Sequence, residues 1–316
     1  MAFGEPLHAL SAAFGEPLYA PNRYPHMMLP RHTAARVALT ALLAVLLSCT
    51  AESPSAPDAG GDAGDASAND DASLDPCAAL FGAPNENTGL DATQCRPVCG
   101  CTAATFIPRA WDVASLAALR ATTQSDAPTD LRDDPYSVPA PAPRPDATVC
   151  ATRFADATTY AVETFASIAE ATAAGAVVTH AGACGVCSSL ADLAVYAGTP
   201  DLTAPVRQCG LDHLGDFAGL VGCLEALGFT PPCAQIWAYN TEHTRAECGA
   251  VCLRLLRAPY HTADGALNDC LMCDEVQSGP VFKSVAGRTR RNSGLANAMC
   301  RPCSEVIPLA HRYPGI

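Results

Sequence analysis

Apolar side chains recur every three or four positions along much of the chain after residue 110, the spacing that gathers them on one face of a helix. This spacing predicts helices at residues 111–120, 154–174, 188–197, 212–227 and 234–257. The β-branched run at 176–179 is the one segment with the character of a strand. The pattern therefore predicts a mainly α, disulfide-rich fold with at most a short strand element.

Two stretches that are poor in large apolar residues divide the chain. Residues 49–75 are mostly alanine, glycine, aspartate and serine, a composition that cannot bury a core and predicts a flexible acidic tether. Residues 126–149 are rich in proline and predict an extended connector. These stretches set off a small cysteine-containing unit at 76–125 from a main cysteine-rich helical domain at 150–316.

A leader precedes the tether. The basic residues Arg31 and Arg36 are followed by an uncharged run at 37–47 and then by Ser48 and Cys49. A basic start, an apolar run and a small residue are the three parts of a secretory signal. The run is too short to span a bilayer, which needs roughly 20 apolar residues. The pattern resembles the signal peptide of bacterial lipoproteins, whose lipobox ends in the cysteine that is cleaved and lipidated.

The resemblance covers residues 27–75 and implies a signal peptide at 27–48, with a lipid on Cys49 that holds the mature chain at a membrane. Thr50, rather than aspartate, after the cysteine resembles lipoproteins sent to an outer membrane. We therefore expect a cell-envelope location, either periplasmic or surface-exposed. Residues 1–26 are expected to be a mis-assigned upstream extension. The expected start is one of the two methionines that open the leader, Met27 or Met28.

The cysteines fit an exported protein. Of the 17 cysteines, Cys49 is assigned to the lipid, and the remaining even number favours disulfides in an oxidising compartment. The cysteines on either side of the proline-rich connector are also even in number, so each group is able to pair within itself. The connectivity cannot be obtained from the sequence. Cys99 and Cys101 are too close to bond to each other comfortably, so we expect them to have different partners.

The charge argues against a nucleic-acid partner. The formal net charge is −13, and much of it lies in the tether. The main domain from Cys150 onward carries 15 acidic and 11 basic side chains. It therefore has no basic excess with which to neutralise phosphates along a nucleic acid.

The first candidate for chemistry is the loop that holds Cys184 and Cys187, between the predicted strand and a helix. A helix N-terminus stabilises a thiolate, and the arrangement resembles the thioredoxin-type CxxC motif, which implies a thiol–disulfide oxidoreductase. A second possibility is a metal site formed by His180 and these cysteines with Cys270 and Cys273, but thiolate sites compete poorly with disulfides outside the cytoplasm. We predict no cofactor, and structural disulfides are the plain alternative.

The second candidate is Lys283, the sole lysine beside 18 arginines. Arginine cannot replace lysine where an amine must lose its proton or form a Schiff base. Lys283 is therefore a candidate catalytic residue, together with His180. Packing of its aliphatic stem is the alternative explanation.

The third candidate follows Lys283 closely. Arg288, Arg290 and Arg291 form the densest cationic cluster of the main domain. Together with Lys283 and Asn292 they could hold a carboxylate, sulfate or phosphate. The alternative is a solvated basic turn, or pairing with two acidic residues earlier in the chain, Asp274 and Glu275.

Together these observations predict a lipid-anchored envelope protein whose exported domain carries a site for a small molecule or anion. We place this site where the loop at 180–187 meets the segment at 283–291, and leave open whether it binds or catalyses. Redox or metal chemistry at Cys184 and Cys187 is one alternative, and a purely structural or protein-binding ectodomain is another. The sequence contains no nucleophile elbow, phosphate-binding glycine loop or dinucleotide fingerprint.

Overall fold

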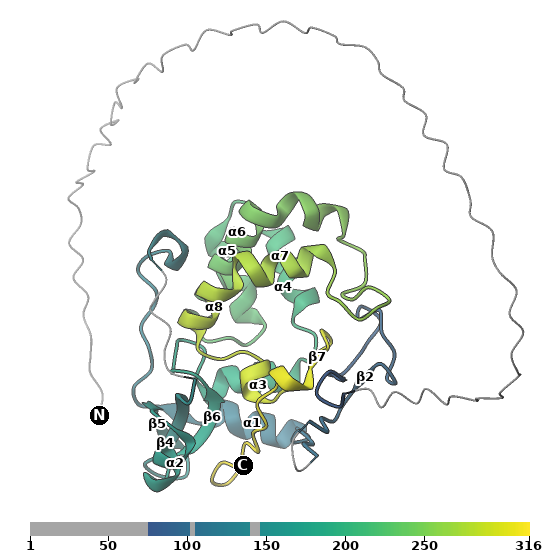
Figure 1. The fold of residues 1–316 in the computed structure, drawn as a ribbon. Helices are drawn as coiled ribbons and strands as arrows, with labels where there is room; N and C mark the ends of the chain where they lie inside the picture. The colour runs from purple at the N-terminus through teal and green to yellow at the C-terminus, as the bar shows by residue number, and fades with distance from the viewer. Residues whose placement is uncertain (1–74, 102–104, 140–145) are drawn as a thin grey trace, which may run out of the picture. The chain divides into compact units, whose positions relative to one another are not determined.

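A computed structural model describes residues 75–101, 105–139 and 146–316 (Figure 1). These residues belong to one compact unit, Ala68–Ile316. The predicted leader, the predicted lipidation site at Cys49 and most of the predicted tether lie outside the described residues. Within the described part of the chain, no helix is both long and apolar enough to cross a membrane.

The fold is mixed α/β, so the prediction of a mainly α fold is wrong. A four-stranded sheet has the order β3-β5-β4-β6, in which β4 pairs antiparallel with both β5 and β6. Its strands are listed here in chain order: β3 (Thr123–Gln124), β4 (Val149–Phe154), β5 (Thr159–Phe165) and β6 (Val177–Ala181). Only the last of these matches the predicted strand.

The predicted helix at 154–174 is the source of this error. The segment forms β5 and only a short helix, α2 (Ile168–Ala173), which packs on the sheet. Tyr160 is buried because β5 lies along β4, whose first four residues are themselves buried. Alternating aromatic and β-branched residues favour a strand once such a partner is present, and this tertiary pairing outweighs the helix propensity of the alanines.

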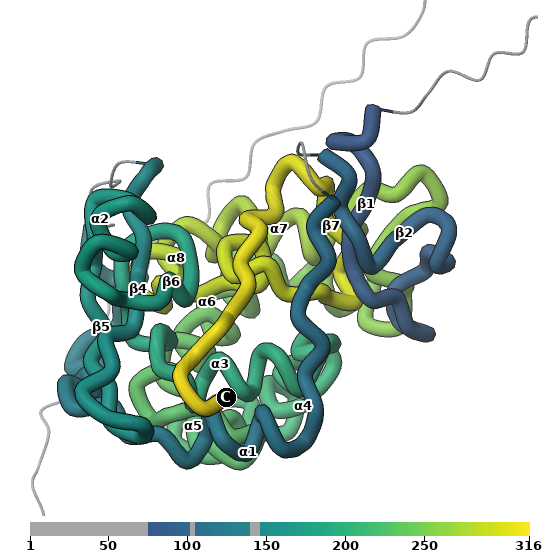
Figure 2. Tube along the Cα trace, turned by 90° about the horizontal axis from the view of Figure 1, so that it is seen from below, coloured from purple at the N-terminus to yellow at the C-terminus, as the bar shows by residue number. Residues whose placement is uncertain are grey.

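A second, smaller sheet joins distant parts of the chain. Its order is β2-β1-β7, with β1 (Leu80–Phe81), β2 (Cys95–Arg96) and β7 (Arg301–Pro302). Figure 2 shows these strands side by side, with the yellow C-terminal segment leaving β7 toward α3. The disulfides Cys95–Cys300 and Cys99–Cys303 fix the same junction. The segment predicted as an N-terminal unit is therefore covalently joined to the end of the main domain.

The helices of the main domain largely follow the predicted pattern. Those at 111–120, 188–197 and 234–257 are confirmed in type, whereas the helix predicted at 212–227 begins only at Phe217, after a turn in which Gly215 has a φ of 75°. The longer helices are α1 (Val113–Ala121), α3 (Leu190–Gly198), α4 (Thr203–Asp212), α5 (Phe217–Ala226), α6 (Pro231–Arg254), α7 (Asp269–Gln277) and α8 (Gly279–Ala286). Short 3-10 turns are found at Pro135–Ser137, Arg291–Ser293 and Cys303–Glu305.

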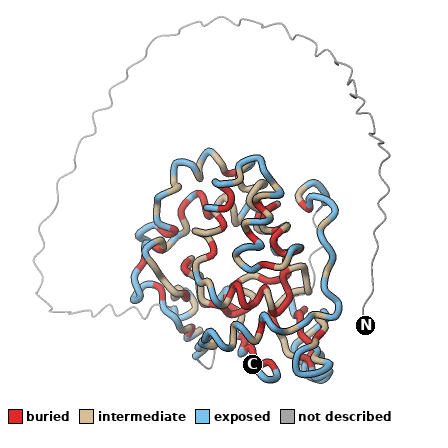
Figure 3. The backbone as a smooth tube through the Cα atoms, turned by 180° about the vertical axis from the view of Figure 1, so that it is seen from behind, coloured by how far each residue is buried: buried red, intermediate tan, exposed pale blue. Residues whose placement is uncertain are grey.

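The main core surrounds α3. Ser189 caps this helix by accepting a hydrogen bond from the Asp192 N–H, and most of the helix is buried. Figure 3 shows buried positions concentrated in the interior of the helical region. Leu193 of α3 and Ile236 of α6 are completely buried in the same cluster, which also takes in Tyr313 near the chain end. The helices and the C-terminal segment therefore share one core.

Eight disulfides hold the described residues together. Cys77–Cys101, Cys95–Cys300 and Cys99–Cys303 confirm that Cys99 and Cys101 have different partners. Two others join α6 to α7, namely Cys248–Cys273 and Cys252–Cys270. The remaining three are Cys150–Cys184, Cys187–Cys233 and Cys209–Cys223. Such a set is typical of a chain that folds in an oxidising compartment outside the cytoplasm.

Candidate functional site

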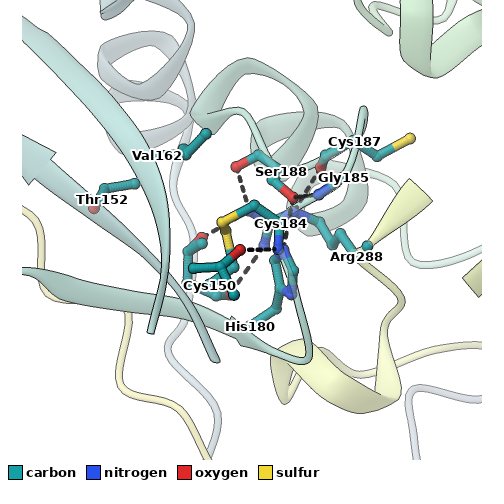
Figure 4. Close-up of a disulfide and its surroundings, with 12 residues drawn as sticks. Cys150, Thr152, Val162, His180, Cys184, Gly185, Cys187, Ser188 and Arg288 are labelled. Carbon is teal, nitrogen blue, oxygen red and sulfur yellow. Dashed lines mark hydrogen bonds between the residues drawn. A yellow bond between two sulfur atoms is a disulfide. The ribbon is translucent and has the colours of Figure 1, made fainter. Parts of the chain in front are cut away.

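The two cysteines of the predicted redox motif are not bonded to each other. Cys184 bonds to Cys150 of β4 (Figure 4), and Cys187 bonds to Cys233 of α6. Each disulfide ties the loop between β6 and α3 to a different element. A thiol–disulfide oxidoreductase cycles one bond between neighbouring cysteines, so this pairing favours the structural alternative for Cys184 and Cys187.

His180 and Ser188 form a buried hydrogen-bonded pair at the same loop (Figure 4). The His180 Nδ1 lies 2.9 Å from the Ala181 carbonyl and so donates to it, which leaves Nε2 to accept from the Ser188 hydroxyl at 2.7 Å. Gly185 N–H also donates to this hydroxyl oxygen, at 2.8 Å. His180 is 0% exposed, and burial followed by the nearby charge of Arg288 lowers its pKa to about 3. The pair resembles a serine activated by a base, yet it is neutral and sealed from solvent.

Arg288 is the most deeply placed of the predicted anion-binding residues. Its guanidinium is 0% exposed, and its hydrogen bonds go to neutral acceptors. The acceptors are the Cys187, Thr179 and Ser188 carbonyls and the Thr179 and Ser293 hydroxyls. Burial lowers its pKa. Arg288 therefore stabilises the loop and sheet and has no donor left for a ligand.

The C-terminal segment completes this buried network. Tyr313 donates to the Thr179 hydroxyl at 2.9 Å, and the His311 Nε2–H donates to the Ser293 carbonyl at 2.6 Å. Burial is the main cause that lowers the pKa of His311, to about 4. We call this network the polar junction, with the members Thr179, His180, Ser188, Arg288, Ser293, His311 and Tyr313. The loop that follows His180 and the arginine segment lie together, and the contact between them is made by Arg288 and not by Lys283.

Two further predicted residues also have structural contacts. Arg290 is buried and donates to the carbonyls of Tyr196, Ala296 and Thr199. The Asn292 side-chain amide donates to the Ala181 and Gly287 carbonyls, both at 2.8 Å. These bonds hold the turn that follows α8 in place. Arg291 is then the arginine of the cluster that pairs with carboxylates.

A cavity of about 630 Å³ lies elsewhere, among α4, α6, α7, α8 and the segment at 289–301. Figure 1 shows α4, α6 and α7 at the end of the molecule away from the four-stranded sheet, with α8 nearer to the sheet. Part of the cavity lining is apolar, with side chains from α4, the residues that flank it and the C-terminal end of α6: Leu202, Val206, Leu211, Leu214, Leu253 and Leu256. Lys283 and Arg291 also line the cavity, whereas His180 and Ser188 are absent from the lining. The two predicted catalytic residues thus belong to different parts of the fold.

Glu275 of α7 is the centre of the charged side of this cavity. Its carboxylate lies 3.3 Å from Lys283 Nζ, 2.6 Å from Arg291 Nη2 and 2.6 Å from Arg301 Nη2. Burial pushes the Glu275 pKa upward, but the three cations outweigh it and hold the pKa below its ordinary value. We call Glu275, Lys283, Arg291 and Arg301 the cationic wall. This pairing of Arg291 with Glu275 is the alternative that the sequence left open.

Asp274 lies on the cavity lining beside this wall. Burial raises its pKa, although it accepts hydrogen bonds from the Thr244 hydroxyl and from Asn240 Nδ2, the latter at 3.2 Å. The Ser278 hydroxyl lies 2.9 Å from that of Thr244 and 3.0 Å from His243 Nδ1. These contacts connect α6 to α7 and to the start of α8.

Arg301 is the member of the site that sequence reasoning missed. It lies between Cys300 and Cys303, where the cysteines dominate the local pattern. Its side chain is 12% exposed and meets Glu275 across a separation of 26 residues. No motif or residue spacing near Arg301 predicts this contact. In the described ranges, no group of three or more histidine, cysteine or acidic side chains is arranged to hold a metal ion.

Comparison with known proteins assigns no activity to this site. A family model described as "Family of unknown function (DUF8771)" matches residues 217–309. No curated protein and no solved structure matches the chain. The matched residues begin at α5 and include the whole cationic wall, whereas the four-stranded sheet lies outside them. The four residues of the cationic wall therefore lie within the matched segment.

Proposed function

We propose that this chain is a lipid-anchored envelope protein whose exported domain binds a small, largely apolar molecule in the cavity among α4, α6, α7 and α8. The cavity itself is the observation that carries the proposal. Its volume of about 630 Å³ falls within the range of roughly 300–1,000 Å³ that is usual for ligand pockets. Mostly apolar walls with a few convergent polar groups are also usual for such pockets.

The envelope location rests on two independent supports. Eight disulfides in the described part of the chain favour folding outside the cytoplasm. The leader that ends at Cys49 resembles a lipoprotein signal and supplies the anchor. We propose the outer membrane as the destination because of Thr50. Metabolic labelling of the full chain with a radioactive fatty acid should label the wild type and leave Cys49→Ala unlabelled. Equal labelling of both would contradict a lipid anchor on Cys49.

Binding is favoured over catalysis by the way in which the charged residues are held. Lys283, the proposed catalytic amine, is ion-paired with Glu275, and its side chain is 43% exposed. His180, its proposed partner, is sealed in the polar junction. The arrangement supplies a shaped apolar space with fixed charges at one side, which is sufficient for a carrier or a receptor.

The test uses the compact unit from residue 68 onward, exported to an oxidising compartment. Every disulfide of the described residues closes within this unit, so it has the covalent links that it needs to fold alone. The neutral apolar dye N-phenyl-1-naphthylamine should bind saturably, with a rise in its fluorescence. Absence of saturable binding would contradict the proposal.

A matched pair of glycine variants locates the dye. Gly249 lines the cavity, and a Cβ added there meets no atom within 4 Å, so Gly249→Phe places a ring in open space. Gly222 of α5 is equally open but does not line the cavity. Gly249→Phe should weaken dye binding by about tenfold or more, equivalent to about 1.4 kcal/mol, while Gly222→Phe leaves it unchanged. Equal effects of both variants would place the dye elsewhere.

A structural or protein-binding ectodomain remains the second candidate. Leu214 and Leu253 border the cavity and are 63% and 68% exposed, so its mouth presents apolar surface. Such side chains suit the contact surface of another protein as well as the entrance for a ligand. If the dye fails to bind, this apolar mouth becomes the part of the molecule to examine for a partner.

A further inference from the structure

The cations of the cationic wall have unused hydrogen-bond donors. Among the described residues, Lys283 and Arg301 each make one side-chain hydrogen bond, and both bonds go to Glu275. An ammonium has three donors and a guanidinium has five. The remaining donors of both residues therefore face the cavity or solvent, in contrast with Arg288, whose donors are all used.

The wall also holds more positive than negative charge. Lys283, Arg291 and Arg301 share Glu275, and Arg291 has one further carboxylate, that of Glu305 at 2.6 Å. Asp274 is beside them, but its oxygens accept from Thr244 and Asn240, and among the described residues no cation forms an ion pair with it. A partly desolvated surplus of cations is complementary to an anion, and a carboxylate accepts well from guanidinium and ammonium groups.

The cavity lining also includes leucine and valine side chains from α4 and the C-terminal half of α6. Two other lining cations have different partners. Arg245 pairs with Glu242 at 2.8 Å, whereas Arg207 donates to the Leu256 carbonyl at 3.1 Å and lies over the Tyr260 ring. One cavity thus offers an apolar surface together with the unused donors of Lys283 and Arg301.

We infer that the ligand is an amphiphile with an apolar body and a small anionic head, and that the head binds Lys283 and Arg301 in competition with Glu275. This inference rests on the proposed function and names the class of its ligand. A single-chain carboxylate is the simplest member of that class. Glu275 then acts as an internal counter-ion, which keeps the cations paired while the cavity is empty and repels the head of an incoming ligand.

If Glu275 competes with the ligand head, removing its charge should raise the affinity for an anionic ligand and not lower it. Removing the charge of a residue that merely supports the wall should weaken every ligand. Removing the charge of a competitor should strengthen binding of the anionic ligand and leave a neutral ligand unaffected. The effect of Glu275→Gln on two ligands that differ only in the head therefore separates the two roles.

The experiment measures displacement of N-phenyl-1-naphthylamine by dodecanoate and by 1-dodecanol, which share one chain length. Dodecanoate should bind the wild type about tenfold more tightly than dodecanol. Lys283→Met should remove most of this preference, and Glu275→Gln should tighten dodecanoate by about threefold or more, with dodecanol unchanged in both. The control variants Arg153→Met and Glu163→Gln alter an exposed ion pair on the four-stranded sheet and should not alter the preference.

The outcomes separate this inference from the proposed function. If the dye and both ligands fail to bind, the proposed function itself is wrong. In a second outcome, the dye and both ligands bind with equal affinity for dodecanoate and dodecanol, or Glu275→Gln weakens both ligands alike. Either result would mean that the cavity binds apolar molecules and that the inferred anionic head group is wrong. Should Glu275→Gln fail to fold, as judged by thermal unfolding, the Lys283→Met arm decides, because Lys283 is partly exposed and tolerates substitution.

Discussion

The polar junction and the cationic wall contain arginines from the same short segment and use them in opposite ways. Arg288 lies in the junction, where neutral carbonyls and hydroxyls accept its hydrogen bonds. Arg291 lies in the wall, where it shares the carboxylate of Glu275 with two other cations at the edge of a cavity. A dense cationic stretch therefore does not identify a ligand site by itself. What distinguishes the two regions is how many donors the protein already satisfies.

Lowering the pH should produce the largest loss of folding stability, and it should arise in the polar junction, because that region contains two buried neutral histidines. Burial lowers the pKa of His180 to about 3 and that of His311 to about 4, below the ordinary value of 6.5. The unfolded chain therefore binds more protons, and stability that is present above pH 6.5 is lost as the pH falls toward these values. Between about pH 6.5 and pH 4.5, each histidine should cost about 1.4 kcal/mol per pH unit.

Urea unfolding at a series of pH values, with the disulfides intact, measures this loss. Burial raises the pKa of Asp192 and Asp274, and these carboxyls act in the opposite direction as the pH falls. The comparison with His180→Gln isolates the histidine contribution, since the variant should have a clearly shallower dependence on pH. Identical slopes for the wild type and the variant would mean that His180 does not titrate as a buried group.

Replacing Arg288 with methionine should produce the next largest effect. The change leaves the Thr179, Cys187 and Ser188 carbonyls without their donor in a buried site, and we expect the free energy of unfolding to fall by about 3–5 kcal/mol. The loss should be almost independent of salt because the site is sealed. Arg312→Met, at an exposed position, should change stability by less than about 0.5 kcal/mol. Comparable losses in the two variants would contradict the structural role of Arg288.

The parts of the fold that sequence could predict are those fixed by local chemistry. The helices at 111–120, 188–197 and 234–257 follow from apolar spacing within each segment, and their type is confirmed. The strand β5 was not visible, because its alanine-rich flank favours a helix until β4 lies beside it. The break at Gly215 was missed for a related reason, since apolar spacing continues through the turn.

The same division applies to the candidate site. Lys283 and Arg291 were noticed because a sole lysine and a dense arginine cluster are properties of the sequence itself. Arg301 was missed because its contact with Glu275 depends on how the segment at 289–301 returns to α7. The burial of Arg288 was equally hidden, since its acceptors lie on β6 and in the loop before α3, about a hundred residues away along the chain (separations 109 and 101).

The smallest predicted effect, that of Glu275→Gln without ligand, sharpens the comparison most. The change leaves Lys283, Arg291 and Arg301 close together with less opposing charge, so we expect a loss of about 1 kcal/mol in the free energy of unfolding. Because these charges are partly exposed, the loss should shrink as salt is raised from about 0.05 to 0.5 M. Denaturant unfolding at both salt concentrations, beside Arg288→Met, tests this directly. If the salt dependence of the two variants is the same, the wall is as closed as the junction, and its cations are not available to a ligand.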